Sequence, residues 1–99
     1  MKKLLRQGDV MLQRIDKLPV GLKKRNSLIL VYGEVTGHKH RLDKGQVFED
    51  NAGKMFVSLK SRAVLLHEEH DPITLEKGNY AVIRQKEYLM KDMVRTVID

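Results

Sequence analysis

All four histidines of the chain lie in two short motifs, and imidazole is the side chain most suited to metal binding and proton transfer near neutral pH. The motifs are Gly37-His38-Lys39-His40 and His67-Glu68-Glu69-His70. On a β-strand, His38 and His40 point to the same face because side chains alternate. The first motif therefore presents two imidazoles together.

The second motif has two readings that depend on local structure. On a strand, His67 shares a face with Glu69. His67 shares a face with His70 only if the chain turns or becomes helical after Glu68. The Asp71-Pro72 pair that follows favours such a turn.

The two motifs together offer three or four metal ligands. These are His38, His40 and His67, with either His70 or Glu69. Nitrogen and oxygen donors of this kind suit zinc or another divalent transition metal, such as iron, nickel or manganese. Because metal ligation needs neutral imidazoles, we expect binding to weaken below about pH 6.

Other roles for these histidines stay open. Imidazoles near a core also hydrogen-bond to neighbouring glutamates and pin loops together, because buried polar groups need partners. They also serve proton transfer or ligand contact, or lie exposed. The chain has no cysteine, and its serines lack a nucleophile-elbow pattern. We therefore expect a small non-enzymatic binding or accessory module, with a small metal-dependent enzyme as an alternative that needs an open coordination position and a pocket.

The first alternative to the binding module with a histidine cluster, ahead of the enzyme, is a basic nucleic-acid-binding module of phage origin, and it rests on the basic charge. The chain has 19 basic and 13 acidic residues, a formal net charge of +6. The candidate nucleic-acid-binding residues are a basic run and one face of a strand: Lys23, Lys24, Arg25, Tyr80, Arg84, Lys86 and Tyr88. Such a face stacks bases and contacts phosphates in some small β-domains, with an affinity that falls steeply with salt. The alternative to nucleic-acid binding is that the charged residues of this strand face are simply solvated and its aromatic residues belong to the core.

Period-two alternation of apolar residues predicts strands almost everywhere. The clearest runs are GDVMLQRID, SLILVYGEV, KMFVSLK, RAVLLHE, NYAVIRQKEY and MVRTVID. Glycine-containing turns separate them. We expect an all-β fold, a small antiparallel β-barrel or sandwich of about seven or eight short strands. Short helical turns are expected only near residues 16–25 and 89–92.

The length of 99 residues favours a single β domain, 1–99. No apolar run approaches the roughly 20 residues that cross a bilayer, and the polar residues after the basic N-terminus interrupt any signal-peptide core. We therefore expect a cytoplasmic protein that does not enter a membrane. Small barrels often associate through a sheet edge, so a homo-oligomer is compatible with the sequence.

The strings RQGDV, GEVTGHKH, HEEHDPI and GNYAVIRQKEY resemble those of an uncharacterised family of small bacterial and phage-associated proteins. The resemblance covers nearly the whole chain and implies its organisation but no activity. The His38-Lys39-His40 triplet also resembles the H-x-H of the cupin superfamily. The glutamate of that motif falls on Lys44 or Gly45 here, and its later histidine is missing, so the likeness extends only to paired imidazoles inside a barrel.

Overall fold

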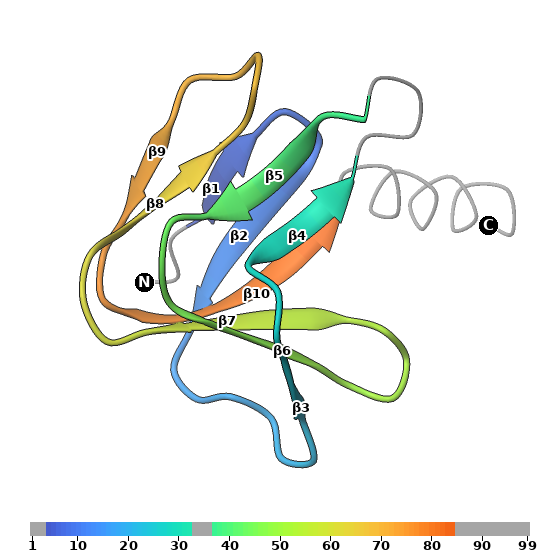
Figure 1. The fold of residues 1–99 in the computed structure, drawn as a ribbon. Helices are drawn as coiled ribbons and strands as arrows, with labels where there is room; N and C mark the ends of the chain where they lie inside the picture. The colour runs from blue at the N-terminus through green and yellow to red at the C-terminus, as the bar shows by residue number, and fades with distance from the viewer. Residues whose placement is uncertain (1–3, 33–36, 85–99) are drawn as a thin grey trace, which may run out of the picture.

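The computed structural model describes residues 4–32 and 37–84, and every regular element within these ranges is a β-strand. Figure 1 shows them in chain order. The strands are β1 (Leu4–Gln7), β2 (Val10–Ile15), β3 (Lys23–Arg25), β4 (Ile29–Tyr32), β5 (Lys39–Leu42), β6 (Gln46–Glu49), β7 (Met55–Leu59), β8 (Ala63–Leu66), β9 (Ile73–Leu75) and β10 (Gly78–Arg84).

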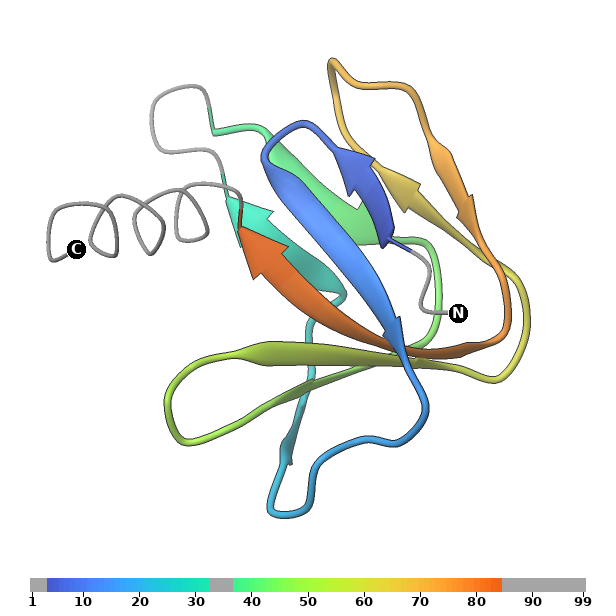
Figure 2. The ribbon, with the colours of Figure 1, turned by 180° about the vertical axis from the view of Figure 1, so that it is seen from behind.

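The strands pair antiparallel into two sheets. The six-stranded sheet has the order β1-β2-β10-β7-β6-β3, and the four-stranded sheet has the order β4-β5-β8-β9. The four-stranded sheet faces the β1-β2-β10 part of the larger sheet, as the two opposite views show (Figures 1 and 2). Neither sheet closes on itself, because β1 and β3 are the edges of one sheet and β4 and β9 those of the other.

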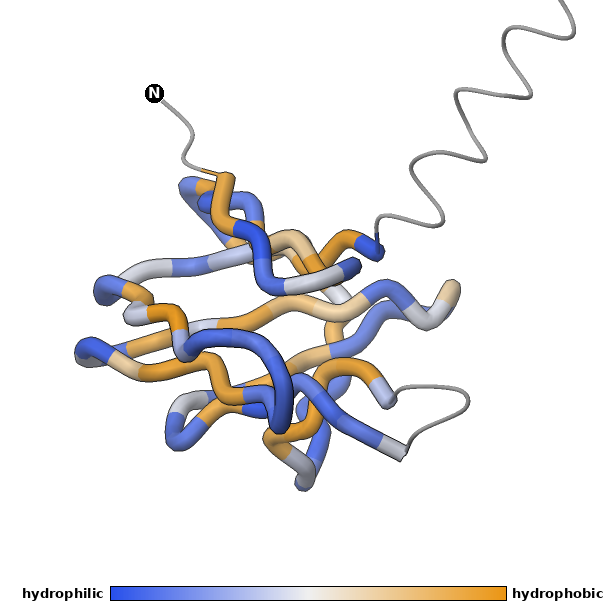
Figure 3. The backbone as a smooth tube through the Cα atoms, turned by 90° about the horizontal axis from the view of Figure 1, so that it is seen from above, coloured by the Kyte–Doolittle hydropathy of each residue, from blue (hydrophilic) through white to orange (hydrophobic). Residues whose placement is uncertain are grey.

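The apolar core lies between the sheets. Alternation selects its members: in β7, Val57 and Leu59 are buried and Ser58 between them is half-buried. Both sheets contribute, with Leu12, Val47, Val57 and Tyr80 from the larger and Leu42, Leu65 and Leu75 from the smaller. Hydrophobic residues run along the inner strands and hydrophilic residues concentrate in the turns (Figure 3). Each buried aliphatic side chain of this kind stabilises the fold by about 1.5–3 kcal/mol.

The all-β prediction is confirmed, and the sandwich describes the structure better than the barrel because neither sheet closes. The described residues form ten strands rather than seven or eight, since elements of three residues such as β3 and β9 are too short to show a repeat in the sequence. The helical turn expected near residues 16–25 is a loop that leads into β3, which forms by pairing with β6. The second helical turn and the strand MVRTVID lie outside the described residues.

Two connections between the sheets run beside each other. The chain passes from β5 to β6 and from β7 to β8, so each link joins one sheet to the other. The Asp43 amide donates to the Val64 carbonyl at 3.0 Å, and the Val64 amide donates to Asp43 Oδ1 at 2.8 Å. These two bonds continue the β5–β8 pairing by one residue and anchor the start of the first link to β8. In the part of the chain that the structure describes, no helix has the length and apolar character needed to cross a membrane.

Candidate functional site

The turn between β1 and β2 carries the first element of the site. Gln7 pairs with Val10, so Gly8 and Asp9 form a two-residue hairpin turn. Gly8 has φ of +61°, whereas no described residue other than glycine has a positive φ. This pattern matches a type II′ turn, which takes glycine at its first central position. A Cβ on Gly8 would lie 2.6 Å from His70 Nε2, so glycine also lets the turn approach the histidines.

Gln7 joins this hairpin to the opposite sheet. Its side chain is buried, and its amide nitrogen donates to the carbonyls of Leu65 and Asp71, each at 2.9 Å. Because both of these partners are acceptors, they fix which end of the Gln7 amide is nitrogen. The other end, Gln7 Oε1, lies 2.9 Å from His40 Nδ1.

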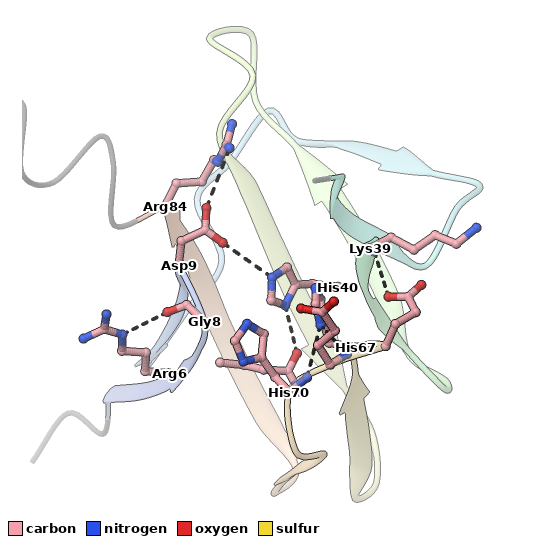
Figure 4. A network of polar contacts seen from close by, with 11 residues as sticks. Arg6, Gly8, Asp9, Lys39, His40, His67, His70 and Arg84 are labelled. Atoms are coloured by element: carbon pink, nitrogen blue, oxygen red, sulfur yellow. Dashed lines mark hydrogen bonds and ion pairs between the residues drawn. The ribbon is translucent and has the colours of Figure 1, made fainter. Parts of the chain in front are cut away.

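The Gln7 contact determines the tautomer of His40. Since Gln7 Oε1 only accepts, His40 Nδ1 must carry the hydrogen and donate it. Burial lowers the pKa of His40. The neighbouring His67 and His70 lower this pKa further, whereas Asp9 raises it. In the resulting neutral ring, Nε2 carries an unprotonated lone pair. That nitrogen lies 3.5 Å from Asp9 Oδ1, so two electron-pair donors face each other (Figure 4).

His67 lies beside His40 because of strand register. β5 pairs with β8 through Arg41 and Leu66, which puts His40 opposite the residue after β8. The ring centroids of His40 and His67 are 4.3 Å apart. His67 Nδ1 accepts the backbone amides of Glu69 and His70, at 3.0 and 3.3 Å. His67 therefore also shapes the turn that the Asp-Pro pair predicts after Glu68.

The remaining histidines complete one cluster. The His70 ring centroid is 4.6 Å from that of His67 and 6.0 Å from that of His40. The His38 ring centroid is 5.6 Å from that of His67, and His38 Nδ1 lies 3.4 Å from Glu69 Oε1. The structure thus brings together all five residues that the sequence offered as metal ligands. Among the described residues, however, no three His, Cys, Asp or Glu side chains have positions that would hold a metal ion as they stand.

Charged residues border the histidine cluster on two sides. The Lys39 amide donates to Glu68 Oε2 at 3.0 Å, and this hydrogen bond lowers the pKa of the Glu68 carboxyl. Across the cluster, Arg84 Nη2 lies 3.8 Å from Asp9 Oδ2 (Figure 4). Arg84 Nε is buried and has no hydrogen-bond partner among the described residues.

Sequence reasoning missed Gln7, Gly8 and Asp9 as site residues. The string QGDV contains all three, and Gly-Asp between two strands is a hairpin signal. That signal predicts the turn but not the sheet on which the turn packs. The contact between Gln7 and His40 spans 33 positions of the sequence, and local patterns carry no information about it.

The structure describes five of the seven candidate nucleic-acid residues, and one of these five, Tyr80, does not lie at the surface. Tyr80 is 1% exposed, and its hydroxyl donates to the Glu76 carbonyl at 2.7 Å. Burial raises the pKa of this phenol. Tyr80 therefore belongs to the core and offers no ring face for base stacking, which differs from the expectation. Arg84 contacts Asp9, as described above. The other residues of that strand face, Lys86 and Tyr88, lie outside the described residues.

The basic run forms the edge strand β3. Lys23 and Lys24 are exposed, and Arg25 Nη1 contacts Glu49 Oε2 at 3.3 Å. The run thus presents two exposed lysines and one arginine that is paired with a carboxylate. A phosphate backbone would meet the lysines first.

The fold and the cluster define a class: a two-sheet antiparallel β domain with four clustered histidines and an adjacent carboxylate. The chain belongs to the family described as Domain of unknown function (DUF8820), whose model matches residues 6–85. This agrees with the uncharacterised family that the sequence strings resemble. The matched region contains the described site, from the β1–β2 turn to Arg84. No curated protein matches the chain. No solved structure matches it either.

Proposed function

We propose that this domain is a small binding module that holds one divalent transition metal ion beside His40. The observation that carries the proposal is the 3.5 Å approach of His40 Nε2 to Asp9 Oδ1, with Gln7 holding the hydrogen on the other ring nitrogen. In this proposal, His40 and Asp9 are ligands and His70 supplies a second imidazole. Zinc is the first candidate, and other divalent ions of similar ligand preference are alternatives.

Electrostatics supports a cation at this point. A neutral imidazole lone pair and a carboxylate oxygen that face each other repel unless a positive charge lies between them. A proton supplies that charge only when His40 ionises, and burial opposes this ionisation. A divalent ion supplies it near neutral pH. Arg84 also contacts Asp9, but at the other carboxylate oxygen.

The Gln7 contact is the type of outer contact that metal-ligating histidines commonly make. Such a histidine donates its second ring N–H to a carbonyl or carboxylate, which fixes both its tautomer and its ring orientation. Gln7 Oε1 provides this acceptor from a buried, doubly anchored side chain. His40 Nε2 is therefore preorganised as a ligand.

The second imidazole must move to complete the site. Two nitrogens that bind one zinc ion at about 2.1 Å lie at most about 4 Å apart. No three candidate ligand side chains among the described residues hold a metal ion as they stand. His70 is exposed at the end of a turn, so rotation of its side chain is the change that we propose completes the set. Ligation by His67 would break its two hydrogen bonds to the turn. His38 and Glu69 contact each other, and their ligand role stays a prediction.

This proposal is a binding function and includes no reaction. The absence of cysteine agrees with a cytoplasmic location, where disulfides are rare. The expected phage association is compatible with the family resemblance and adds nothing to the chemistry of the site.

The test is metal titration of tag-free protein after treatment with a chelator. Cobalt absorption reports coordination by imidazole and carboxylate, and competition with zinc gives the zinc affinity. We expect one ion per chain with a Kd of about 1 μM or tighter. Asp9→Asn and His70→Asn each remove one ligand from an exposed position, and each should weaken binding at least about tenfold.

Asp16→Asn is the matched control because Asp16 is exposed and the charge change is the same. This variant should bind the metal as the parent does. If the protein shows no saturable metal binding at concentrations up to about 1 mM, the proposal is refuted. Equal affinities of Asp9→Asn and Asp16→Asn refute the assignment of Asp9.

A further inference from the structure

A pocket lies where the two links between the sheets run side by side. It is lined by Lys44, Gly45, Gln46, Ser58, Lys60 and Ser61. The first three follow the end of β5, and the last two precede β8. The histidine cluster involves the start of β5 and the residues after β8. The pocket and the cluster therefore lie at opposite ends of this strand pair, and the pocket is independent of the proposed metal site.

The walls of the pocket are fixed by two sets of contacts. Gln46 pairs with Ser58 in the β6–β7 ladder. Two hydrogen bonds of 2.8 and 3.0 Å between Asp43 and Val64 anchor the start of the first link to β8. These bonds lie directly beside the lining residues in sequence. The pocket is thus part of the folded framework and not a gap between loose side chains.

Gly45 allows the close approach that forms the pocket. Its φ is +121°, in the region that favours glycine. A Cβ at this position would lie 2.5 Å from Leu59 Cδ2. Since Leu59 is a buried core residue, it has little freedom to move away. Glycine therefore lets the first link pack directly against the end of β7.

The lining is suited to a small anion. Lys44 and Lys60 provide two ammonium groups, while Ser58, Ser61 and Gln46 provide hydroxyl and amide donors. None of the six lining residues is acidic. The neighbouring carboxylate of Asp43 accepts the Val64 amide, which holds it in the link contact. An anion in the pocket would meet two positive charges and several neutral donors.

Size restricts the ligand further. The cavity volume is about 200 Å³. Pockets for drug-sized ligands measure about 300–1,000 Å³, so this one suits a single compact group. A phosphate group carries about −1.5 to −2 charges near neutral pH and three strong acceptor oxygens. Lysine is a common phosphate ligand, acting as a point charge.

We propose that the Lys44–Lys60 pocket binds a phosphate group, held by both ammonium groups and by the hydroxyls of Ser58 and Ser61. The group comes either from free inorganic phosphate or from the phosphate monoester of a small molecule. Both sources present the same terminal oxygens to the pocket. In a monoester, one phosphate oxygen is bonded to a carbon group that must extend out of the pocket. Inorganic phosphate has no such group.

The test uses the full chain after chelator treatment, so that no bound metal contributes to anion binding. Inorganic phosphate and phenyl phosphate are titrated separately while amide shifts are followed by NMR at constant ionic strength. We expect saturable shifts confined to residues 44–46 and 58–61, with a Kd of about 1 mM or tighter. Similar affinity for both probes supports free phosphate as the ligand. Tighter binding of phenyl phosphate supports an ester.

The matched variants separate the pocket from the general basic charge. Lys44→Gln/Lys60→Gln removes both ammonium groups of the pocket. Lys17→Gln/Lys77→Gln removes two exposed lysines that do not line it, with the same change in net charge. The pocket variant should bind phosphate at least about tenfold more weakly, and the control should change less than about twofold.

All four lysines are exposed, so both double variants should fold, and their melting temperatures check this. Absent binding, shifts spread over the whole surface, or equal losses in the two variants overturn the proposal. A positive result in metal-free protein also leaves the metal proposal untouched, because the two tests share no variant and no ligand.

Discussion

Replacement of Gln7 by methionine tests the central contact of the site. Gln7→Met keeps the approximate length and volume of the side chain but removes its amide. Three groups then lose their present partner: the carbonyls of Leu65 and Asp71, and the Nδ1–H of His40. The change therefore isolates hydrogen bonding from packing.

The magnitude follows from the burial of these bonds. A buried donor or acceptor that loses its partner costs about 1–3 kcal/mol. The bonds to Leu65 and His40 are buried, whereas the bond to Asp71 is partly buried, so water recovers some of its energy. We expect a total loss of about 3–5 kcal/mol in the free energy of unfolding. For a domain of this size, that lowers Tm by about 15–30 °C.

The assay is equilibrium unfolding in urea with metal-free protein, and imidazole ¹⁵N shifts report the tautomer of His40 in the same samples. Gln13→Met is the matched control, since Gln13 is half-buried on the next strand, and it should cost at most about 1 kcal/mol. A Gln7→Met variant within about 1 kcal/mol of the parent, with an unchanged His40 tautomer, would refute the reasoning.

Three further predictions follow from the described contacts. Gly8→Ala should lower the free energy of unfolding by about 1–3 kcal/mol in urea, because of its positive φ and the close approach of His70; an unchanged midpoint contradicts this. In metal-free protein, burial lowers the pKa of His40 below its unfolded value of 6.5, so the folded state binds fewer protons there than the unfolded state. The contribution of His40 to the free energy of unfolding should therefore be fully present above about pH 6.5 and should fall as the pH drops from there towards the folded pKa. Unfolding curves at constant ionic strength measure this change. If they show no loss over this interval, the His40 ring is not buried in its neutral form. Tyr80→Phe removes the hydroxyl that donates to the Glu76 carbonyl and should cost about 1 kcal/mol in thermal unfolding without changing oligonucleotide binding; a selective loss of such binding would place Tyr80 at a surface instead.

Local patterns predicted the inner strands well. In β2, β7 and β10 every second residue packs into the core cluster, and this alternation is visible in the sequence. Met11, Phe56 and Ala81, which lie between these positions, are buried as well. β1 and β3 carry no such repeat. They form strands because their backbone groups pair with those of β2 and β6. Their own residues therefore do not predict them.

The same division applies to the site. The types and spacing of the histidines singled out the cluster, and the β5–β8 register explains why the two motifs meet. The positions of Gln7 and Asp9 could not be predicted, because they depend on how one sheet packs on the other. The burial of Tyr80 has a similar origin: its strand face was predictable, but which face the second sheet covers was not.

The anchoring of Gln7 has a consequence for the order of events during synthesis. Its bonds to Leu65 and Asp71 span 58 and 64 positions. Contacts of such separation form only after the intervening loop has closed. A nascent chain that ends before residue 71 therefore lacks the clamp that orients His40. Under the proposed function, ion binding at this nitrogen is therefore expected only in chains whose translation has passed that residue.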